Sequence, residues 1–425
     1  SVYLVAILIL GTCLFLIMRS AMKYFDQAFP KYDELNASVQ ENVSAIRVVK
    51  AYVREDHETS KFHKAAENIY KIFCKAEENL SFNAPLMQLT VYSCILLISW
   101  LGAKMIVGSS LTTGELMSLL TYCMNILMSL MMLSMVFVMI TMSLASARRI
   151  TEVLNEKSDL DNPENPDFDI PDGSITFDHV YFNYKKGAGE PVLSDINLSI
   201  KSGETIGIIG GTGSAKTSLV NLISRLYDVT EGSIKVGGKD VRSYDMETLR
   251  NEVAVVLQKN VLFSGTILDN LRWGDKNASE EECKRVCRLA CADEFIDRMP
   301  EGYNTYIEQG GSNVSGGQKQ RLCIARALLK KPKVLILDDS TSAVDTATDA
   351  KIRKAFLTEI PETTKLIIAQ RISSVQDADR IIVMENGKVN GFGSHEELLK
   401  TNEIYREVYE SQTGGGGDFD EKRGE

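Results

Sequence analysis

The stretch GGTGSAKTS, residues 210–218, follows the apolar run ETIGII and precedes the helical pattern LVNLI. It matches the phosphate-binding pattern G-x-x-x-x-G-K-[ST] at Gly210, Lys216 and Thr217, but Ala215 stands where that pattern has its second glycine. Backbone N–H groups of such a loop surround phosphate oxygens, and the N-terminus of the following helix adds favourable partial charge. The stretch therefore predicts a strand, a phosphate-binding loop and a helix, with Lys216 reaching the β- and γ-phosphates and Thr217 ligating Mg²⁺.

The C-terminal part of the chain consists of short apolar runs separated by helical patterns. These runs are ETIGIIG (204–210), EVAVVLQ (252–258), KVLILDD (333–339), TKLIIAQ (364–370) and RIIVMENG (380–387), and before them GSITFDHVYFNY (173–184) alternates like a strand. Near-continuous apolar strands between helices are typical of a mainly parallel sheet covered on both faces. One run carries Asp338 at its end, where a carboxylate is placed to hold Mg²⁺ through water. The prediction is an α/β P-loop nucleotide-binding domain over residues 174–410.

The N-terminal part carries three apolar segments. They are residues 2–18, 84–108 and 116–145. A helix needs roughly 20 apolar residues to cross a bilayer, so each segment is a predicted span, with a buried core helix as the alternative. Basic residues follow the first and third segments, whereas the link 109–115 has none. The positive-inside rule therefore places residues 19–83, and everything after 146, in the cytoplasm.

The remaining segments complete the predicted domain organisation. Residues 19–83 have the composition of long helices, interrupted at 40–56 by an apolar patch that needs a partner surface. Three spans leave the N-terminus outside, so we expect the helical domain, residues 1–154, to be part of a larger membrane domain. Residues 155–173, rich in Pro, Asp and Asn, predict a linker. The glycine-rich, acidic residues 411–425 predict a flexible tail.

Charge and cysteine spacing restrict the function classes. A formal net charge of −10 argues against a general nucleic-acid binder, which presents a basic surface. Cys283, Cys287 and Cys291 recur every four residues, which is compatible with a metal cluster or with one face of a helix. No histidine or second cysteine pair completes a ligand set, so the helix face is the favoured interpretation.

At NVSGGQKQR, residues 313–321, the chain resembles the ATP-binding cassette exporters, and the resemblance covers nearly its whole length. VSGGQ (314–318) is similar to the signature motif of that family, and SAVD (342–345) to the loop that crosses to the partner subunit. Residues 40–56 resemble the stretch with a coupling helix, which would dock on a nucleotide-binding domain. The three spans resemble the last three of six helices in an exporter half.

The resemblance implies ATP and Mg²⁺ as cofactors and assigns roles to particular residues. Gln258 matches the loop that joins the nucleotide site to the membrane helices, and it would also hold Mg²⁺ together with Thr217 and Asp338. The residues implied to bind ATP in this chain's own site are Tyr184 (stacking on adenine), Gly210, Gly211, Thr212, Gly213, Ser214, Ala215, Lys216, Thr217, Ser218 and Gln258. The residues implied to contact ATP in the partner's site are Ser315, Gly316, Gly317 and Gln318, with Asp345 in the dimer loop.

Three positions depart from the family pattern. Asp339 replaces the glutamate that serves as general base, and Gln370 replaces the switch histidine. An aspartate carboxylate sits about one ångström back from the attacking water, and misplacement on that scale can cost on the order of a hundredfold in rate. Glutamine can form hydrogen bonds to phosphate but cannot carry the charge or proton of histidine. Ala215 is the mildest departure, because one methyl group at a positive φ costs roughly 1 kcal/mol.

These observations predict a partial α-helical transmembrane domain, about three spans with long cytoplasmic extensions, followed by the nucleotide-binding domain. We expect a multi-pass protein of the cell membrane, in contact with lipid, with its nucleotide-binding domain in the cytoplasm. Its function would be ATP-driven export of an amphipathic or hydrophobic small molecule, lipid or peptide. The variant site and intact signature favour a heterodimer with a second half-transporter. The alternatives are a slow homodimeric exporter and an ATP-gated channel or regulator.

Overall fold

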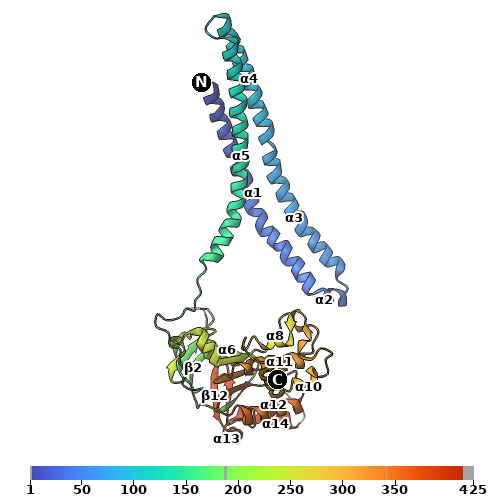
Figure 1. Ribbon diagram of the computed structural model, residues 1–425, viewed down its shortest axis with the longest axis vertical. Helices are drawn as coiled ribbons and strands as arrows, with labels where there is room; N and C mark the ends of the chain where they lie inside the picture. The colour runs from blue at the N-terminus through green and yellow to red at the C-terminus, as the bar shows by residue number, and fades with distance from the viewer. Residues whose placement is uncertain (1, 186–188, 341, 415–425) are drawn as a thin grey trace. The chain divides into compact units, whose positions relative to one another are not determined.

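The computed structural model describes residues 2–185, 189–340 and 342–414. The chain divides into two compact units, Ser1–Lys157 and Ser158–Glu425. The described part of the first unit is helical, and the strands of the described chain all belong to the second (Figure 1).

The first unit consists of long helices. They are α1 (Val2–Ser44), α2 (Ile46–Ala51), α3 (Glu55–Ser81), α4 (Asn83–Val107) and α5 (Thr113–Asn155). Helices α1 and α5 each contain 43 residues, so each is roughly 65 Å long. That is about twice the hydrocarbon thickness of a bilayer, which is roughly 30 Å. The predicted helical extensions beyond the spans are therefore present.

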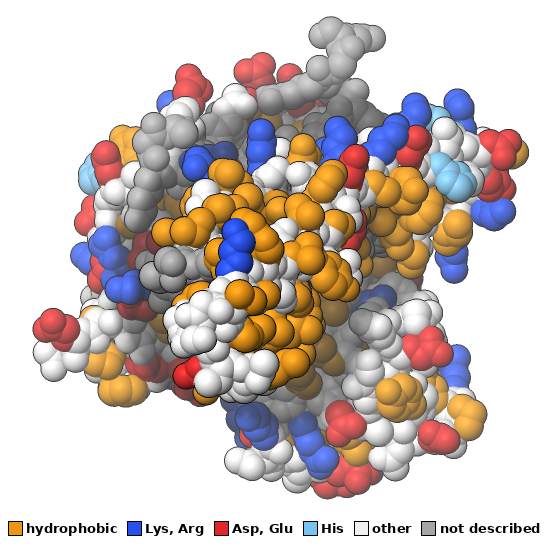
Figure 2. All heavy atoms as spheres, turned by 90° about the horizontal axis from the view of Figure 1, so that it is seen from above, with side chains coloured by type: hydrophobic (Ala, Val, Ile, Leu, Met, Phe, Trp, Pro, Cys, Tyr) orange, Lys and Arg blue, Asp and Glu red, His pale blue; other side chains and the backbone are white. Residues whose placement is uncertain are grey.

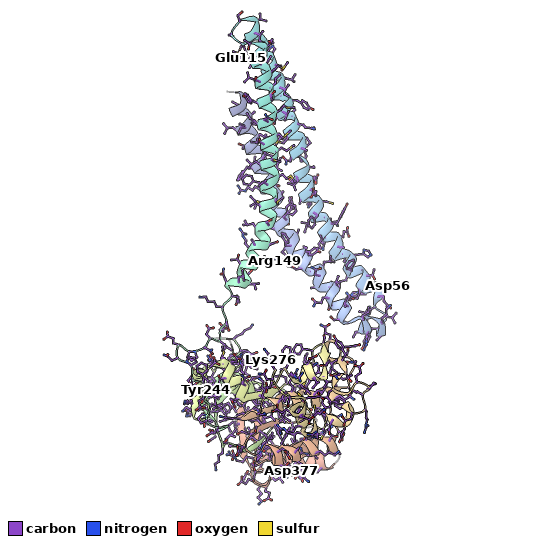
Figure 3. All side chains as sticks on the ribbon, viewed as in Figure 1. Asp56, Glu115, Arg149, Tyr244, Lys276 and Asp377 are labelled. Atoms are coloured by element: carbon purple, nitrogen blue, oxygen red, sulfur yellow. The ribbon has the colours of Figure 1, made fainter. Side chains whose placement is uncertain are left out.

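Three stretches of this unit are long and apolar enough to cross a membrane. Within the described residues they are Val5–Ser44, Glu55–Val107 and Thr113–Phe137. Figure 2 shows hydrophobic side chains gathered over much of the face seen end-on, and methionines of α5 such as Met132 are mostly exposed. Charged side chains labelled in Figure 3 lie near the ends of the helices, with Glu115 near the start of α5 and Arg149 near its end. An apolar surface of this length is stable only when lipid or another protein covers it.

Different contacts hold the two ends of the helical unit. Along the polar half, α1 and α3 contact each other through the Phe25 and Phe73 rings, 6.2 Å apart, and through the Lys61–Glu41 ion pair at 2.8 Å. A small apolar core joins α1, α4 and α5 in the other half. Among the residues that the structure describes, the buried side chains of this core are Leu10, Met87, Cys94, Ile98 and Cys123. An ion pair and a ring contact therefore join the helices in the polar half, whereas apolar side-chain packing joins them in the other half.

Residues 40–56 contain the predicted break in the long helices. Helix α1 ends at Ser44, α2 occupies Ile46–Ala51, and α3 begins at Glu55. Val53 has a positive φ of 52°, which turns the chain between α2 and α3. Tyr52 and Val53 are 75% and 79% exposed, so the apolar patch of this segment is uncovered within the helical unit.

The second unit contains two main sheets. Its strands are β1 (Ile175–Phe182), β2 (Leu193–Ile200), β3 (Thr205–Gly210), β4 (Glu231–Val236), β5 (Lys239–Asp240), β6 (Val253–Val256), β7 (Gly265–Thr266), β8 (Tyr306–Ile307), β9 (Val334–Asp338), β10 (Thr364–Ile368), β11 (Arg380–Glu385) and β12 (Lys388–Gly393). The larger sheet has the order β12-β11-β3-β10-β9-β6 and is parallel except for the edge strand β12. The smaller sheet, β2-β1-β4-β5, is antiparallel. Strands β7 and β8 form a separate pair.

The second unit also contains helices. They are α6 (Lys216–Ile223), α7 (Met246–Glu252), α8 (Ile267–Leu271), α9 (Glu280–Leu289), α10 (Asp293–Ile296), α11 (Gly316–Leu329), α12 (Thr346–Glu359), α13 (His395–Thr401) and α14 (Glu403–Gly414), with 3₁₀ turns η1 (Val241–Ser243), η2 (Gly302–Asn304), η3 (Gln309–Gly311) and η4 (Ile372–Ser374). Along β3, Ile208 belongs to the core shared with α6 and the antiparallel sheet, whereas Ile209 belongs to the core shared with α9, α11 and α12. Both faces are therefore buried, as near-continuous apolar strands require.

Two of the three cysteines of the repeat lie on the buried face of α9, as the favoured interpretation predicts. Cys283 and Cys287 are in the core, and Cys291 follows just after the helix and is also buried. No group of three or more His, Cys, Asp or Glu side chains suited to a metal ion occurs among the residues that the structure describes. Burial raises the pKa of the Cys287 thiol to about 12, so this cysteine is a packing residue.

The linker and the tail have different boundaries from those that the sequence predicts. Within the predicted linker 155–173, Asp167 pairs with Tyr244 of the second unit and Ile170 is buried there. The C-terminal tail is predicted from residue 411, but α14 extends to Gly414. The side chain of Gln412, on α14, forms hydrogen bonds to the backbone of Gln370 and Ile372, and these bonds explain why the helix is longer than predicted. Residues 415–425 lie outside the described residues.

Tyr244 anchors the linker to the second unit. It is fully buried, and its hydroxyl donates to the Val236 carbonyl at 2.7 Å (Figure 3). We expect Tyr244→Phe to lower the stability of this unit by about 1 kcal/mol, because the carbonyl loses a buried hydrogen bond. Thermal unfolding should show a decrease of about 2–4 °C. Tyr306→Phe is the control, because Tyr306 is 57% exposed, and an equal decrease there would contradict the prediction.

Candidate functional site

The phosphate-loop pattern forms a tight turn around the ammonium group of Lys216. The loop joins β3 to α6, and Lys216 Nζ donates to the carbonyl oxygens of Gly210 at 2.7 Å and Gly211 at 2.8 Å. A Cβ atom at Gly210 would lie 2.4 Å from the Met384 carbonyl oxygen, so only glycine fits there. The loop therefore presents Lys216 and the N-terminus of α6, which no side chain caps, at the end of the central strand.

Ala215 adopts the left-handed conformation that the pattern's glycine would supply. Its φ is 70° and its ψ is 24°, and it stands at the N-cap of α6. The methyl group packs at the edge of the core and leaves the loop intact. The departure at Ala215 thus costs strain without removing any hydrogen bond of the loop.

Next to the loop, two of the three residues expected to hold Mg²⁺ contact each other. Thr217 Oγ1 donates to Asp338 Oδ2 at 2.9 Å, across 121 residues of sequence. Asp338 ends β9 and is only 3% exposed, and its burial raises the pKa of its carboxyl group. A hydroxyl, a carboxylate and the nearby Gln258 amide oxygen are the hard oxygen ligands that Mg²⁺ prefers. The donor set therefore fits Mg²⁺: Thr217, Gln258 and Asp338 would hold the ion, whose charge would offset the buried carboxylate.

Asp339 lies beside this set and is within hydrogen-bonding range of two side-chain amides. Gln370 Nε2 donates to Asp339 Oδ2 at 3.1 Å, and Gln258 Nε2 approaches the same oxygen at 3.4 Å. Asp339 has a positive φ of 47°, so the chain turns sharply after β9. The two variant positions thus lie together in space although 31 residues separate them in sequence.

All these residues line one cavity of about 340 Å³. Its lining includes most of the residues predicted to bind ATP, namely Gly210, Thr212, Gly213, Ser214, Ala215, Lys216, Thr217, Ser218 and Gln258, together with Asp338, Asp339 and Gln370. Val192 and Ile368 also line it and were not predicted, because an apolar wall has no local sequence signal. Phosphates with a bound divalent ion would be held between the loop and Asp338.

Tyr184 contacts the loop outside the lining of this cavity. Its hydroxyl lies 2.8 Å from Ser218 Oγ, and its ring packs edge-on against Phe182 and Tyr227 at 4.8 and 5.0 Å. Half of the side chain is exposed. An aromatic surface is thus present beside the N-terminus of α6.

The signature residues form a second cluster, and none of them lines the loop cavity. Ser315 caps α11, where its Oγ accepts from the Gln318 N–H and the Gln318 side chain accepts from the Ser315 N–H. Gly316 and Gly317 begin the helix. A Cβ at Gly317 would lie 2.7 Å from the Ala343 carbonyl oxygen, so the helix start is pressed against the SAVD loop.

The SAVD loop is also held from α11 and α12. Gln320, which was not predicted, is buried and accepts from the Ala343 N–H at 3.0 Å. Asp345 caps α12 by accepting from the Thr348 N–H at 2.9 Å. The signature and the dimer loop therefore form one rigid surface in this chain, separate from its phosphate-loop cavity.

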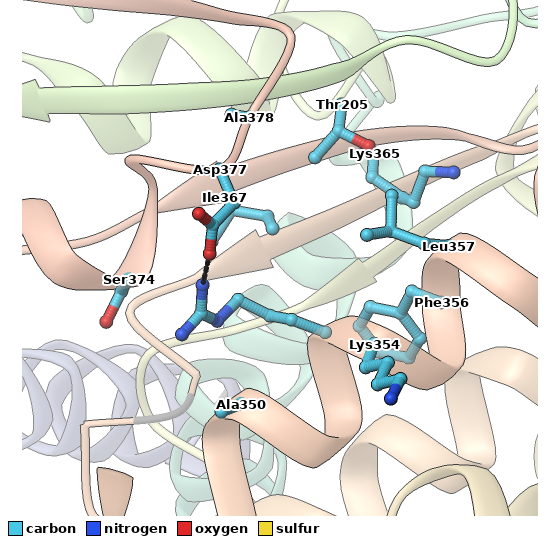
Figure 4. A pocket seen from close by; sticks show the side chains of 11 residues that line it. Thr205, Ala350, Lys354, Phe356, Leu357, Lys365, Ile367, Ser374, Asp377 and Ala378 are labelled. Atoms are coloured by element: carbon cyan, nitrogen blue, oxygen red, sulfur yellow. Dashed lines mark hydrogen bonds and ion pairs between the residues drawn. The ribbon is translucent and has the colours of Figure 1, made fainter. Parts of the chain in front are cut away.

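A further cavity of about 260 Å³ lies among α12, β10 and the turn after η4. Most of its wall is apolar, with Phe356, Leu357 and Ile367 among the side chains in Figure 4. At its edge Asp377 pairs with Arg353 at 3.2 Å, and Arg353 also pairs with Asp349 of its own helix at 3.2 Å. These ion pairs hold the turn between η4 and β11.

Comparison with known families identifies the chain. The family model described as ABC transporter matches residues 193–342, and the model described as ABC transporter transmembrane region matches residues 2–131. An uncharacterized ABC transporter ATP-binding protein of Bacillus subtilis, YfiB, is 39% identical over 411 residues, which cover 97% of this chain and 71% of that protein. The chain belongs to the ABC transporters.

Two further relatives specify the kind of ABC transporter. An ATP-dependent lipid A-core flippase of Desulfotalea psychrophila is 38% identical over 380 residues, or 89% of this chain and 66% of that protein. A solved structure of a bacterial Atm1-family ABC exporter with ATP bound matches with a TM-score of 0.90 at 27% identity, over 96% of this chain and 72% of that one. The chain is therefore an exporter half-transporter, in which a transmembrane region precedes an ATP-binding domain. Its activity is ATPase-coupled transport, and such exporters work as dimers.

The left-handed conformation of Ala215 gives a stability prediction. We expect Ala215→Gly to stabilise the nucleotide-binding unit of this exporter half by roughly 1 kcal/mol, because glycine adopts a positive φ without strain. Thermal unfolding should rise by about 2–4 °C. Ala347→Gly, in helix α12, should instead destabilise by up to about 1 kcal/mol. A decrease in stability for both variants would contradict the assigned strain at Ala215.

Proposed function

We propose that this chain is one subunit of a heterodimeric ABC exporter of the cell membrane. Its own phosphate-loop site retains ATP and Mg²⁺ but hydrolyses ATP slowly. Its signature, Ser315 to Gln318, completes the competent site of a second half-transporter. The substrate is an amphipathic or hydrophobic molecule that leaves the cytoplasm.

The environment of Asp339 carries this proposal. A general base must take a proton from the attacking water, and the side chain at position 370 must stabilise the charge that develops on the γ-phosphate. Here the carboxylate is one methylene shorter than glutamate, and the side chain at position 370, which donates to it, is a neutral amide. This amide cannot supply a positive charge or exchange a proton at neutral pH. Lys216, Thr217 and Asp338, by contrast, keep the arrangement that binding requires.

The intact signature supports the role of the partner's site. Ser315 and the N–H groups of Gly316 and Gly317 are at the N-terminus of α11, a helix of 14 residues, where a γ-phosphate is favourable. A heterodimer with two unequal ATP sites requires slow turnover in one site and a complete signature motif for the other. A pair of identical chains would have the variant residues in both sites.

Substrate class and coupling follow from the helical unit. Exposed methionines along α5, such as Met128 and Met135, offer an adaptable apolar surface, and a relative is described as a lipid A-core flippase. These two observations support an amphipathic, lipid-like substrate. We assign coupling to α2, whose neighbours Tyr52 and Val53 are exposed and apolar.

Restoring the family residues tests the proposed slow site. We expect the purified chain in lipid nanodiscs to hydrolyse MgATP slowly, and the double substitution Asp339→Glu with Gln370→His to raise turnover between about 10- and 100-fold. The reason is that the longer carboxylate reaches the water and histidine supplies charge, and misplacement of one ångström costs on the order of a hundredfold. Phosphate release gives kcat and KM for each variant.

The control for this experiment is Lys216→Ala. In the restored chain it should abolish turnover, since the phosphates lose their charge-assisted contact. Fast hydrolysis by the native chain alone that Lys216→Ala abolishes would contradict the asymmetric site and favour a homodimeric exporter. An unchanged rate in the restored chain would contradict the roles of positions 339 and 370.

A further inference from the structure

The C-terminal helix holds the backbone of the switch segment, defined here as residues 369–374. Gln412 on α14 makes two hydrogen bonds to this segment: its Nε2 donates to the Gln370 carbonyl oxygen at 3.1 Å, and its Oε1 accepts from the Ile372 N–H at 2.8 Å. A primary amide can donate and accept at the same time. Gln412 therefore pairs with this stretch of backbone in the way that a neighbouring strand would.

The switch segment needs such a partner because it leaves the sheet at this point. The Ala369 N–H still donates to the Ile208 carbonyl oxygen of β3, at 3.2 Å. The next regular element, η4, begins at Ile372, whose N–H belongs to the first turn and has no partner within that helix. Between these two points the backbone of Gln370 lies outside both elements, and Gln412 supplies both missing bonds.

Buried side chains hold the helix that carries Gln412, α14, against the rest of the second unit. Tyr405 of α14 is fully buried, and its hydroxyl lies 2.6 Å from His395 Nδ1. Val408, one turn further along, is also in the core. Beyond η4, the Asp377–Arg353 pair fixes the other end of the turn (Figure 4). Gln412 thus connects a rigid helix to the stretch that lies between two fixed points.

The side chain of Gln370 is directed at the reacting groups. Its Nε2 donates to Asp339 Oδ2 at 3.1 Å, while its own carbonyl oxygen accepts from Gln412. Gln370 therefore contacts Asp339 through its side chain, and it contacts Gln412 of α14 through its backbone. A shift of its peptide by one ångström would move the amide out of hydrogen-bonding range of Asp339.

We propose that Gln412 is a positioning residue for ATP hydrolysis: it fixes the peptide of residue 370 so that the side chain there reaches Asp339 and the γ-phosphate. This inference rests on the proposed role of position 370 in this chain's own site. Gln412 itself does not line the phosphate-loop cavity. The C-terminal helix is thereby part of the hydrolytic apparatus, although it is 42 residues from the switch.

The test is a double-mutant cycle in the native exporter in lipid nanodiscs. Turnover of γ-labelled ATP is measured for the native chain, Gln412→Leu, Gln370→Ala and the double variant. We expect Gln412→Leu to lower kcat about tenfold with KM changed by less than about twofold, because phosphate binding does not involve α14. In the Gln370→Ala background the same substitution should change kcat by less than about twofold, because the group it positions is gone.

Two further variants separate positioning from folding. Gln412→Glu keeps the acceptor for the Ile372 N–H and loses the donor to Gln370, so its kcat should fall between those of the native chain and Gln412→Leu. Thr413→Val changes the adjacent exposed residue of α14 and should leave kcat unchanged. Amide hydrogen exchange gives a readout independent of hydrolysis: Gln412→Leu should speed exchange at Ile372 at least about tenfold and leave β10 unchanged.

The outcomes distinguish this inference from the proposed function. An unaltered kcat in Gln412→Leu, an equal loss with and without Gln370, or unaltered exchange at Ile372 would each overturn the positioning role. The proposed slow site is contradicted by different results: fast ATP turnover by the native chain, or no gain in turnover on the double substitution Asp339→Glu with Gln370→His. The cycle can be read in either case, because it compares variants of the native chain with one another.

Discussion

The parallel pairing of β3, β10 and β9 is the constraint on which the site depends. In register, Ile208 of β3 lies beside Ile368 of β10, and Ile368 lies beside Asp338 of β9. Parallel strands end at the same edge of a sheet, so the segments that follow these three strands meet there. They are the phosphate loop, the Asp338–Asp339 pair and the switch segment. The burial of both sheet faces fixes the register, because a slip of one residue would expose an apolar row.

On the proposed function, binding and cleavage depend on different residues of one cavity. Lys216 and Thr217 come from the loop after the central strand and would hold phosphate and Mg²⁺. Asp339 and Gln370 follow the ends of β9 and β10 and would act on the water. Substitutions at the second pair would therefore slow cleavage without disturbing the first pair. A subunit with this division can retain ATP while its signature serves the site of a partner.

Much of this organisation could be predicted from local patterns, and the exceptions are instructive. The apolar runs that contain β3, β9 and β10 predicted the parallel sheet, since only buried strands are apolar on both faces. The antiparallel sheet β2-β1-β4-β5 was not predicted: its β1–β2 and β4–β5 pairs join neighbouring strands, but the β1–β4 pair joins strands that β2, β3 and α6 separate in sequence. The tail was predicted from residue 411, whereas α14 extends to Gly414: the residues around Gln412 are polar and lead into glycines, and the hydrogen bonds to the distant switch segment explain the helix there. Long-range hydrogen bonds leave no periodic signal in the sequence.

The central claim is that this chain's own site holds ATP without cleaving it quickly, and the nucleotide retained there tests it most directly. The exporter, in lipid nanodiscs and with its partner where one is present, is incubated with Mg²⁺ and a photoreactive ATP labelled on the α-phosphate. Free nucleotide is removed, the complex is irradiated, and the label on this chain is identified as triphosphate or diphosphate. The account predicts that the label is mainly ATP and is lost in Lys216→Ala. Label that is mainly ADP after the first few turnovers would contradict it.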